Sequence, residues 1–178
     1  RYVGTPRMSS LARHLSDRLD IQYHTRITSI RNEDDVWSLQ KEDGDSVSGY
    51  DALILTLPPE QAMPLEQDWP ALHESLGAVK MLPCWAGMLG FIEPLDVPYD
   101  GLFVNDGPLS WVCRNSSKPG RPGAETWVVH ASPEWSINHL EDTPETVIAA
   151  LKAAFFDLPG FSEYPLRFET AHRWRYSL

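Results

Sequence analysis

The sequence predicts an α+β fold in which a mostly antiparallel sheet with a few helices follows part of a separate α/β domain. Short runs of β-branched and aromatic residues, separated by turn-forming residues, recur between residues 80 and 176. Residues 52–57 form a continuous apolar run, which suits a strand buried on both faces of a layered α/β domain. Pro58-Pro59 ends this run, and we expect the domain boundary there.

Local signals place the elements before this boundary. A helix is predicted over 9–19, because a serine can cap its start and apolar residues then recur at helical spacing. The stretch 21–30 favours one or two short strands. Residues 36–40 are typical of a hairpin partner, which the turn Asp43-Gly44-Asp45 closes.

The second part of the chain predicts helices near 60–66 and 69–79, followed by a series of strands. These strands are expected at 80–92, 101–105, 109–115, 125–132 and 164–176. A loop rich in Pro, Gly and Ser covers 116–123. Two further helices begin at Ser132-Pro133-Glu134 and Thr143-Pro144-Glu145, where a capping hydroxyl precedes a proline and an acid of the first turn.

The composition excludes several classes of protein. The chain has 178 residues and a net charge of −10, whereas a general nucleic-acid binder needs an excess of lysine and arginine. No apolar run approaches the roughly 18 residues of a membrane helix. Cys84 and Cys113 lie in apolar strand-like stretches, which fits a reducing cytoplasm and excludes a zinc site built on cysteine pairs.

No catalytic or metal-binding motif is evident. The sequence has no Gly-x-Ser-x-Gly elbow, no Walker-type loop and no cluster of His, Cys and carboxylate residues at metal-ligand spacing. We therefore predict no catalytic side chain and no metal ligand. No signal peptide is visible, and the chain begins and stops in mid-pattern, so we expect an internal fragment of a longer protein.

The final strand alternates aromatic and basic residues. On a strand, His172, Trp174 and Tyr176 share one face, whereas Arg173 and Arg175 share the other. The simpler interpretation is a half-buried edge strand with a solvent-facing pair of arginines, and on this strand alone we favour it. The alternative is an aromatic wall beside an anion-binding pair.

A positive cluster follows the strand at 109–115. Alternation places Leu109, Trp111, Cys113 and Asn115 on one face, and Ser110, Val112 and Arg114 on the other. Arg114, Lys118 and Arg121 are locally concentrated in an acidic chain, which a solvated loop explains adequately. If the final strand lies nearby, five or six cations converge and favour the phosphate of a ligand such as a dinucleotide.

The remaining candidates are one histidine and the tryptophans. His130 shares a strand face with Thr126, Val128 and Ser132, and a lone strand histidine is most often structural. Some of the seven tryptophans must belong to the core, and a flat aromatic ligand or a sugar would suit the others. They are at positions 37, 69, 85, 111, 127, 135 and 174.

Several longer motifs together resemble the bacterial renalase-like group of the flavin-containing amine oxidase superfamily. The two most specific are Leu109-Ser110-Trp111-Val112-x-Arg114-Asn115-Ser116-x-Lys118-Pro119-Gly120-Arg121 and Trp127-Val128-Val129-His130-Ala131-Ser132-Pro133-Glu134-Trp135-Ser136. The others are Tyr2-Val3-Gly4-x-Pro6-x-Met8-Ser9, Leu55-Thr56-Leu57-Pro58-Pro59-x-Gln61, Leu82-Pro83-Cys84-Trp85-Ala86 and His172-Arg173-Trp174-Arg175-Tyr176.

The resemblance implies a two-domain flavoprotein with a Rossmann-like FAD-binding domain and a mixed-sheet substrate domain. On that map residues 1–58 belong to the FAD domain, 59–172 to the substrate domain, and 173–178 to a strand that returns toward the FAD domain. The implied cofactor-binding residues are Ile27, Thr56, Leu57 and Pro58. The implied substrate-binding residues are Trp111, Arg114, Asn115, His130, Trp174 and Tyr176.

Three departures from the family pattern bear on cofactor binding. The Gly-x-Gly-x-x-Gly turn that holds the FAD pyrophosphate is absent, as is the C-terminal flavin segment. Arg7 occupies a position where a small residue is expected. We therefore expect FAD to be held mainly by segments that this chain lacks, and the chain alone to be inactive.

The implied reaction is oxidation of a dihydronicotinamide, an isomeric form of NAD(P)H, by hydride transfer to flavin with oxygen as acceptor. The substrate is then a small molecule, expected to be a dinucleotide. One alternative within the superfamily is an amine oxidase, although arginines repel an amine. The others are a non-enzymatic module whose exposed, coplanar tryptophans bind a ligand such as a glycan, and a structural domain whose tryptophans are all core.

Overall fold

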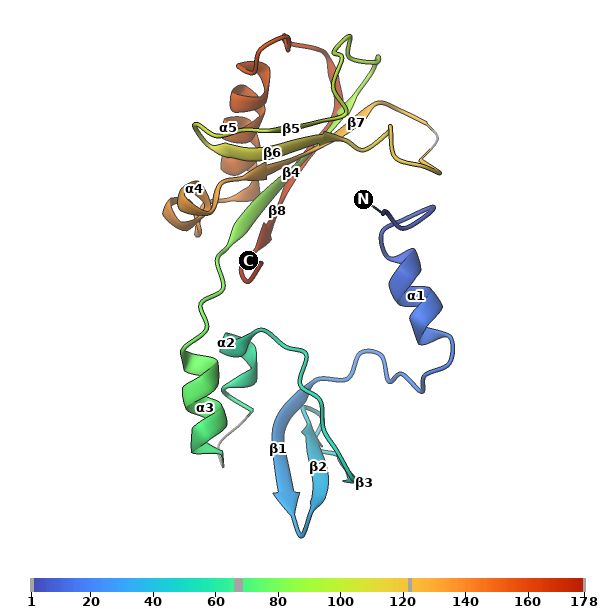
Figure 1. Cartoon of the computed structure of the whole chain (residues 1–178), viewed down its shortest axis with the longest axis vertical. Helices are drawn as coiled ribbons and strands as arrows, with labels where there is room; N and C mark the ends of the chain where they lie inside the picture. Colours follow the sequence, from blue (N-terminus) through green and yellow to red (C-terminus); the bar gives the residue numbers. More distant parts are fainter. Residues whose placement is uncertain (1, 66–68, 122, 178) are drawn as a thin grey trace. The chain divides into compact units, whose positions relative to one another are not determined.

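The computed structural model describes residues 2–65, 69–121 and 123–177 and divides into two compact units (Figure 1). One unit comprises Arg1–Arg18 and Leu82–Leu178, and the other comprises Leu19–Met81. The predicted α+β class is confirmed, because antiparallel sheets are combined with a few helices.

The unit Leu19–Met81 contains a three-stranded antiparallel sheet of β1 (Ile27–Glu33), β2 (Val36–Lys41) and β3 (Ser46–Tyr50). The predicted hairpin is confirmed. Asp45 N donates to Asp43 Oδ1 at 3.0 Å, and Gly44 has a φ of +95°, which a residue with a Cβ rarely adopts. A second tight turn, at Asp34 and Asp35, connects β1 to β2.

Two short helices follow in the same unit: α2 (Pro59–Ala62) and α3 (Pro70–Gly77). Both have proline at the start, where its missing N–H is not needed. They confirm the helices predicted at 60–66 and 69–79, although both are shorter than predicted.

The strand predicted at 52–57 is wrong. These residues belong to no strand and make no backbone hydrogen bond within the described part of the chain, and Ile54 is 84% exposed. An apolar run forms a strand only when it pairs with a neighbouring strand. The sheet of this unit consists of β1, β2 and β3 and does not include residues 52–57.

The unit of Arg1–Arg18 and Leu82–Leu178 is built on a five-stranded sheet in the order β5-β6-β7-β4-β8, with every pair antiparallel. All five strands were predicted from the sequence. Their bounds are β4 (Cys84–Phe91), β5 (Gly101–Phe103), β6 (Leu109–Arg114), β7 (Thr126–Ala131) and β8 (Leu166–Trp174).

Three helices belong to this unit: α1 (Ser10–Ser16), α4 (Pro133–Asn138) and α5 (Pro144–Phe156). Both predicted caps are confirmed, because Ser132 Oγ accepts from Trp135 N at 3.2 Å and Thr143 Oγ1 accepts from Thr146 N at 3.3 Å. Helix α1 confirms the helix predicted at 9–19 but ends at Ser16.

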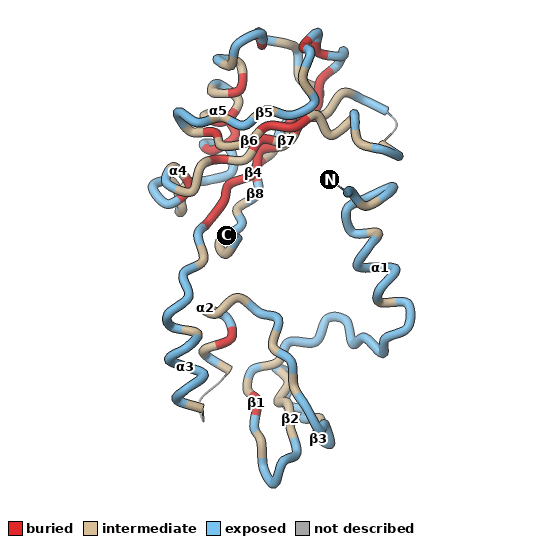
Figure 2. Tube along the Cα trace, viewed as in Figure 1, coloured by how far each residue is buried: buried red, intermediate tan, exposed pale blue. Residues whose placement is uncertain are grey.

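The hydrophobic core lies between α5 and one face of the five-stranded sheet, as the buried segments in Figure 2 show. Phe155 of α5 is fully buried and packs edge-to-face on Trp127 of β7, with ring centroids 5.5 Å apart. Gly87 of β4 allows this close packing, because a Cβ there would lie 2.7 Å from Val129 Cγ2. The other face of the sheet is not covered by α5.

Candidate functional site

The face of the five-stranded sheet opposite α5, here called the open face, carries the candidate site. Residues directly opposite one another in an antiparallel pair point to the same side of the sheet. The register pairs Ala86 with His130 and with His172, and it pairs Cys84 with Trp174. The other members of this face are Met88, Phe103, Trp111, Cys113, Thr126, Val128, Phe168 and Thr170.

The open face is apolar and partly accessible. Phe103 is 63% exposed, and Phe168 and Trp174 are each 55% exposed, which is high for large aromatic side chains. No aspartate, glutamate, lysine or arginine belongs to the strand positions of this face. An apolar, accessible sheet face of this kind suits a flat aromatic partner.

A shallow concavity of about 420 Å³ lies on the open face. It is lined by Ala86, Met88, Val128, His130, His172 and Trp174. The rings of His172 and Trp174 meet edge-to-face, with centroids 4.7 Å apart and planes at 72°. The concavity therefore has one aromatic wall, an aliphatic floor and two imidazoles as its polar groups.

A bulge in β6 determines which of its side chains reach the open face. The register shifts between Leu109 and Trp111, so that Leu109 pairs with Ala131 and is buried in the core. The predicted common face of Leu109 and Trp111 is therefore wrong. Ser110 occupies the bulge, and its hydroxyl donates to Ala131 O at 3.1 Å.

The predicted division of β7 and of β8 into two faces is confirmed, but the predicted solvent-facing pair of arginines on β8 is wrong. Arg173 and Arg175 are half-buried, whereas Trp174 on the opposite face is 55% exposed. Trp127, Val129 and Ala131 are buried against the core, whereas Val128 and His130 line the concavity. His172 and Trp174 share the open face, and Arg173 points the other way. Tyr176 follows the end of β8 and is half-buried.

Burial lowers the pKa of the His130 imidazole below its ordinary value of 6.5, and the positive charge of Lys118 lowers that pKa further. The imidazole is therefore neutral at neutral pH. The His130 ring therefore adds no formal charge to the concavity at neutral pH.

His130 also predicts a pH dependence of stability. The unfolded chain binds a proton at His130 near pH 6.5, whereas the folded chain binds it only at lower pH. The free energy of unfolding should therefore fall as the pH drops below 6.5, because the unfolded state binds more protons there. Urea denaturation across this range should show a smaller decline in His130→Gln. An unchanged decline would contradict the prediction, and His14→Gln controls for the loss of a histidine elsewhere in the unit.

Arg114, a predicted substrate-binding residue, is engaged in the protein interior. Its Nη2 donates to Leu95 O at 3.0 Å and to Val97 O at 3.2 Å. Its Nε lies 3.2 Å from Glu125 Oε1, an ion pair without the alignment of a hydrogen bond. The guanidinium carbon also lies 5.1 Å from the centroid of the Trp127 ring. In this structure Arg114 holds the 95–97 segment and faces away from the open face.

The arginines of the last strand are also paired. Arg175 Nη1 donates to Glu141 Oε1 at 2.8 Å and Arg173 Nη1 to Glu141 Oε2 at 3.0 Å. Strands β7 and β4 separate β6 from β8, a spacing of about 14 Å. The convergence of five or six cations that a nearby final strand would produce therefore does not occur.

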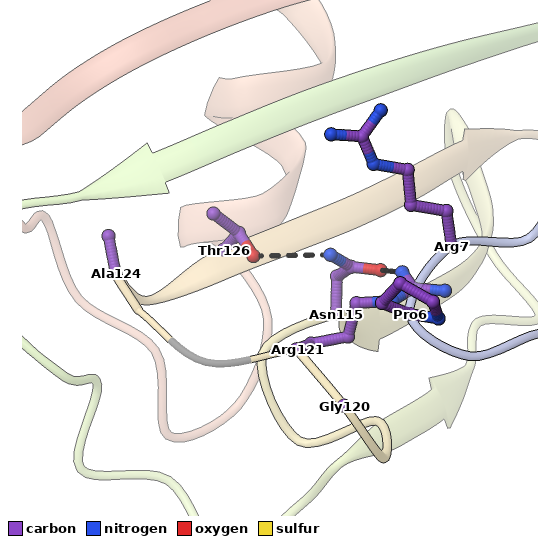
Figure 3. A pocket seen from close by; sticks show the side chains of 7 residues that line it. All are labelled: Pro6, Arg7, Asn115, Gly120, Arg121, Ala124 and Thr126. Carbon is purple, nitrogen blue, oxygen red and sulfur yellow. Dashed lines mark hydrogen bonds between the residues drawn. The ribbon is translucent and has the colours of Figure 1, made fainter.

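Asn115 lies at a second, polar pocket, shown in Figure 3. This pocket has a volume of about 440 Å³ and is lined by Pro6, Arg7, Asn115, Gly120, Arg121, Ala124 and Thr126. Asn115 Oδ1 accepts from Arg121 Nη1 at 2.9 Å, and its Nδ2 donates to Thr126 Oγ1 at 3.4 Å. The contribution of Arg7 was not predicted, since it depends on a contact between segments far apart in the sequence.

The structure brings three of the six predicted substrate-binding residues to these two pockets. His130 and Trp174 line the concavity, and Asn115 lines the polar pocket. Trp111 belongs to the open face beside Phe103, with ring centroids 4.5 Å apart. The sequence reasoning missed Met88, which alternation along β4 places opposite the buried Gly87 and Leu89.

The predicted cofactor-binding residues lie in the unit Leu19–Met81. Ile27 begins β1 and is half-buried, and Pro58 precedes α2. Thr56 and Leu57 are exposed, and their backbone groups make no hydrogen bond to any described residue. Because both residues are exposed, these backbone groups are open to solvent.

Two other kinds of site find no support. Within residues 2–65, 69–121 and 123–177, no three His, Cys, Asp or Glu side chains lie together in a way that could hold a metal ion. No helix in the described part of the chain is long and apolar enough to cross a membrane. The cysteines Cys84 and Cys113 are both buried and form no disulfide.

Solved structures with the same fold include enzymes of different activities. A protein from Exiguobacterium sp. 255-15, provisionally described as a protoporphyrinogen oxidase, is 18% identical with a TM-score of 0.77, over 96% of this chain and 39% of that chain. Putrescine oxidase bound to putrescine is 15% identical with a TM-score of 0.59, over 91% of this chain and 41% of that chain. A CLA-producing fatty acid isomerase from P. acnes is 15% identical with a TM-score of 0.59, over 92% and 38%.

These identities establish a shared fold and leave the activity open. The chain spans about two-fifths of the length of these structures. The sequence itself matches the pattern of the family described as flavin containing amine oxidoreductase over residues 2–170. Because this match extends over nearly the whole sequence, the chain belongs to the flavin containing amine oxidoreductase family.

Proposed function

We propose that this chain contributes the substrate-binding sheet of a renalase-like, FAD-dependent oxidoreductase that oxidises a dihydronicotinamide such as an isomer of NAD(P)H. The supporting observation is the combination of an apolar concavity with a cation-lined pocket along one strand. Val128 and His130 line the first, and Thr126, on the same face of β7, lines the second. A ligand with a flat ring and an anionic tail matches this combination.

The concavity suits the ring of such a substrate. Trp174 offers an accessible aromatic surface, and Met88 and Val128 offer aliphatic contacts. The neutral imidazole of His130 provides a hydrogen-bonding group without a charge that would repel the positive ring of the product. These side chains align the substrate and keep water away from its ring, and neither role requires a general acid or base.

FAD is the proposed cofactor. When bound, it would accept two electrons and the hydrogen of a hydride, which leaves an aromatic pyridinium, and the electrons and two protons would then convert oxygen to hydrogen peroxide. Ile27, Thr56, Leu57 and Pro58 are the residues of this chain proposed to contact it. The Gly-x-Gly-x-x-Gly turn is absent from the sequence, so we also propose that the chain alone is inactive.

The second candidate is oxidation of an amine. The observation that favours it is the exposed Trp174, because an aromatic face attracts an ammonium group. Neither pocket, however, is lined by an aspartate or glutamate to pair with a cation, and the polar pocket is lined by two arginines. Charge therefore favours an anionic substrate over an amine.

The exposure of the tryptophans favours neither non-enzymatic alternative, the glycan-binding module or the structural domain. Trp85 and Trp127 are fully buried, Trp135 stacks on His139, and Trp37 packs on Trp69. Trp174 alone among the seven tryptophans is exposed, so the chain has neither a coplanar exposed set nor an entirely buried one.

A cytoplasmic location is also part of the proposal. The observation that supports it is the pair of cysteines that form no disulfide.

The test is a comparison of electron donors with the complete flavoprotein under anaerobic conditions. Dihydronicotinamide mononucleotide isomers are expected to bleach the visible absorbance of the flavin, and readmitted oxygen should restore it with one hydrogen peroxide per oxidised donor. Putrescine and other amines should leave the absorbance unchanged. Bleaching by an amine but by no dihydronicotinamide would replace this proposal with the amine oxidase.

A further inference from the structure

The polar pocket of Pro6, Arg7, Asn115, Gly120, Arg121, Ala124 and Thr126 has an excess of positive charge (Figure 3). Its lining includes two guanidinium groups, one amide and one hydroxyl, and no carboxylate. This is unusual in a chain with a net charge of −10. A pocket of this composition attracts a small anion.

Arg121 is held in place by neutral acceptors. Its Nη1 donates to Asn115 Oδ1 at 2.9 Å and its Nη2 to Gly4 O at 3.1 Å. Its buried Nε has no hydrogen-bond partner among the described residues. The guanidinium is therefore fixed in position while no carboxylate neutralises its charge.

Arg7 enters the same pocket from the segment before α1. Its backbone is fixed by two hydrogen bonds, Arg7 N to Ser10 Oγ at 3.2 Å and Ser10 N to Arg7 O at 3.0 Å. Its exposed side chain makes no hydrogen bond or ion pair with any residue that the structure describes. Arg7 thus adds a second charge that remains available to a ligand.

The walls of the pocket are built by close packing of the loop against the N-terminal segment. Gly120 has a φ of +70°, and a Cβ there would lie 2.4 Å from Thr5 Cγ2. Thr5 Oγ1 donates to Pro119 O at 3.5 Å. Glycine is required at this position on both counts, so the packing of this loop against the N-terminal segment that carries Arg7 is part of the fold.

The two pockets lie along one strand. Thr126 of the polar pocket and His130 of the concavity share the open face of β7, four residues or about 13 Å apart. A ligand whose ring occupies the concavity can therefore extend a phosphate toward the arginines. Arginine binds phosphate with paired N–H donors, which makes it well suited to this anion.

We propose that Arg7 and Arg121, with Asn115 and Thr126, bind a phosphate group of the substrate. This inference rests on the proposed function, since it assigns the phosphate to a dihydronicotinamide nucleotide. The sequence analysis placed Arg114 in the phosphate-binding cluster, but its guanidinium binds the carbonyls of Leu95 and Val97. The proposed site has Arg7 in its place. The same phosphate chemistry could come from FAD, and the experiment separates the two sources.

The experiment compares two donors that differ by one phosphate, in the complete flavoprotein. Arg7→Gln should weaken the apparent affinity for dihydronicotinamide mononucleotide by roughly tenfold, as expected for the loss of a charged hydrogen-bonding group. Its affinity for dihydronicotinamide riboside, which has no phosphate, should not change. Arg167→Gln, which removes an exposed arginine of β8 outside the pocket, is the matched control and should behave as the wild type.

Calorimetry with pyrophosphate gives a second readout that needs no turnover. Arg7→Gln should weaken pyrophosphate binding by roughly tenfold as well. Equal weakening of both donors, or pyrophosphate binding independent of Arg7, would overturn the assignment. Loss of flavin from Arg7→Gln with unchanged donor selectivity would also overturn it and assign the pocket to FAD. If neither donor reduces the flavin while pyrophosphate binding depends on Arg7, the proposed function fails and the phosphate pocket stands.

Discussion

Replacing Arg114 with leucine is expected to lower the free energy of unfolding by about 3 kcal/mol, the lower end for breaking a buried ion pair. The side chain of Glu125 is 8% exposed, so the substitution leaves a buried carboxylate without its cation. The carbonyls of Leu95 and Val97 lose their donor at the same time. Urea denaturation monitored by tryptophan fluorescence measures the effect.

A double variant separates the charge effect from the loss of packing. Arg114→Leu combined with Glu125→Gln should recover part of the lost stability, because the amide still accepts from Trp127 Nε1 and leaves no unpaired charge. Arg167→Leu, at an exposed position of β8, is the control and should change stability by less than about 0.5 kcal/mol. If Arg114→Leu were as stable as the wild type but bound the substrate more weakly, Arg114 would belong to the substrate site.

Replacing Trp174 with alanine is expected to lower kcat/KM for the dihydronicotinamide by roughly tenfold to a hundredfold. The reason is that stacking of a base on an aromatic side chain contributes about 1–3 kcal/mol. Because Trp174 is 55% exposed, its removal should have little effect on folding. Steady-state kinetics of the complete flavoprotein, together with its melting temperature, measures both quantities.

Phe168 offers a closely matched control for Trp174. It lies on the same strand and the same face, is also 55% exposed, and does not line the concavity. Phe168→Ala should therefore retain the activity of the wild type. Equal losses in the two variants would mean that the whole open face, and not the concavity, determines activity.

The strands and helices of the unit with the five-stranded sheet could be predicted because their signals are local. Alternation along β7 identifies its buried face directly, and a hydroxyl, proline and acid mark the starts of α4 and α5. The 52–57 run shows the limit of such signals. Its apolar composition predicts burial, but a strand also needs a partner, and the partner cannot be read from the run itself.

The candidate site was only partly predictable, because its geometry depends on contacts between distant segments. Alternation correctly grouped His130 with Val128 and Trp174 with His172, but the pairing through β4 that brings both groups to one face was not predicted. The bulge at Ser110 could not be predicted from alternation. Because of it, Leu109 lies in the core and not on the face of Trp111. Arg121 contacts Gly4, 117 residues earlier, so the role of Arg7 in the polar pocket has no local signature.

The most direct test of this account follows the hydrogen itself, with a dihydronicotinamide mononucleotide that carries deuterium at the donor carbon. With deuterium at both hydrogen positions of the donor carbon, anaerobic bleaching of the flavin should slow with a primary isotope effect, and the oxidised nicotinamide should keep only one of the two deuterium atoms. Bleaching of the flavin by amines alone, with no reaction of any dihydronicotinamide, would contradict the account.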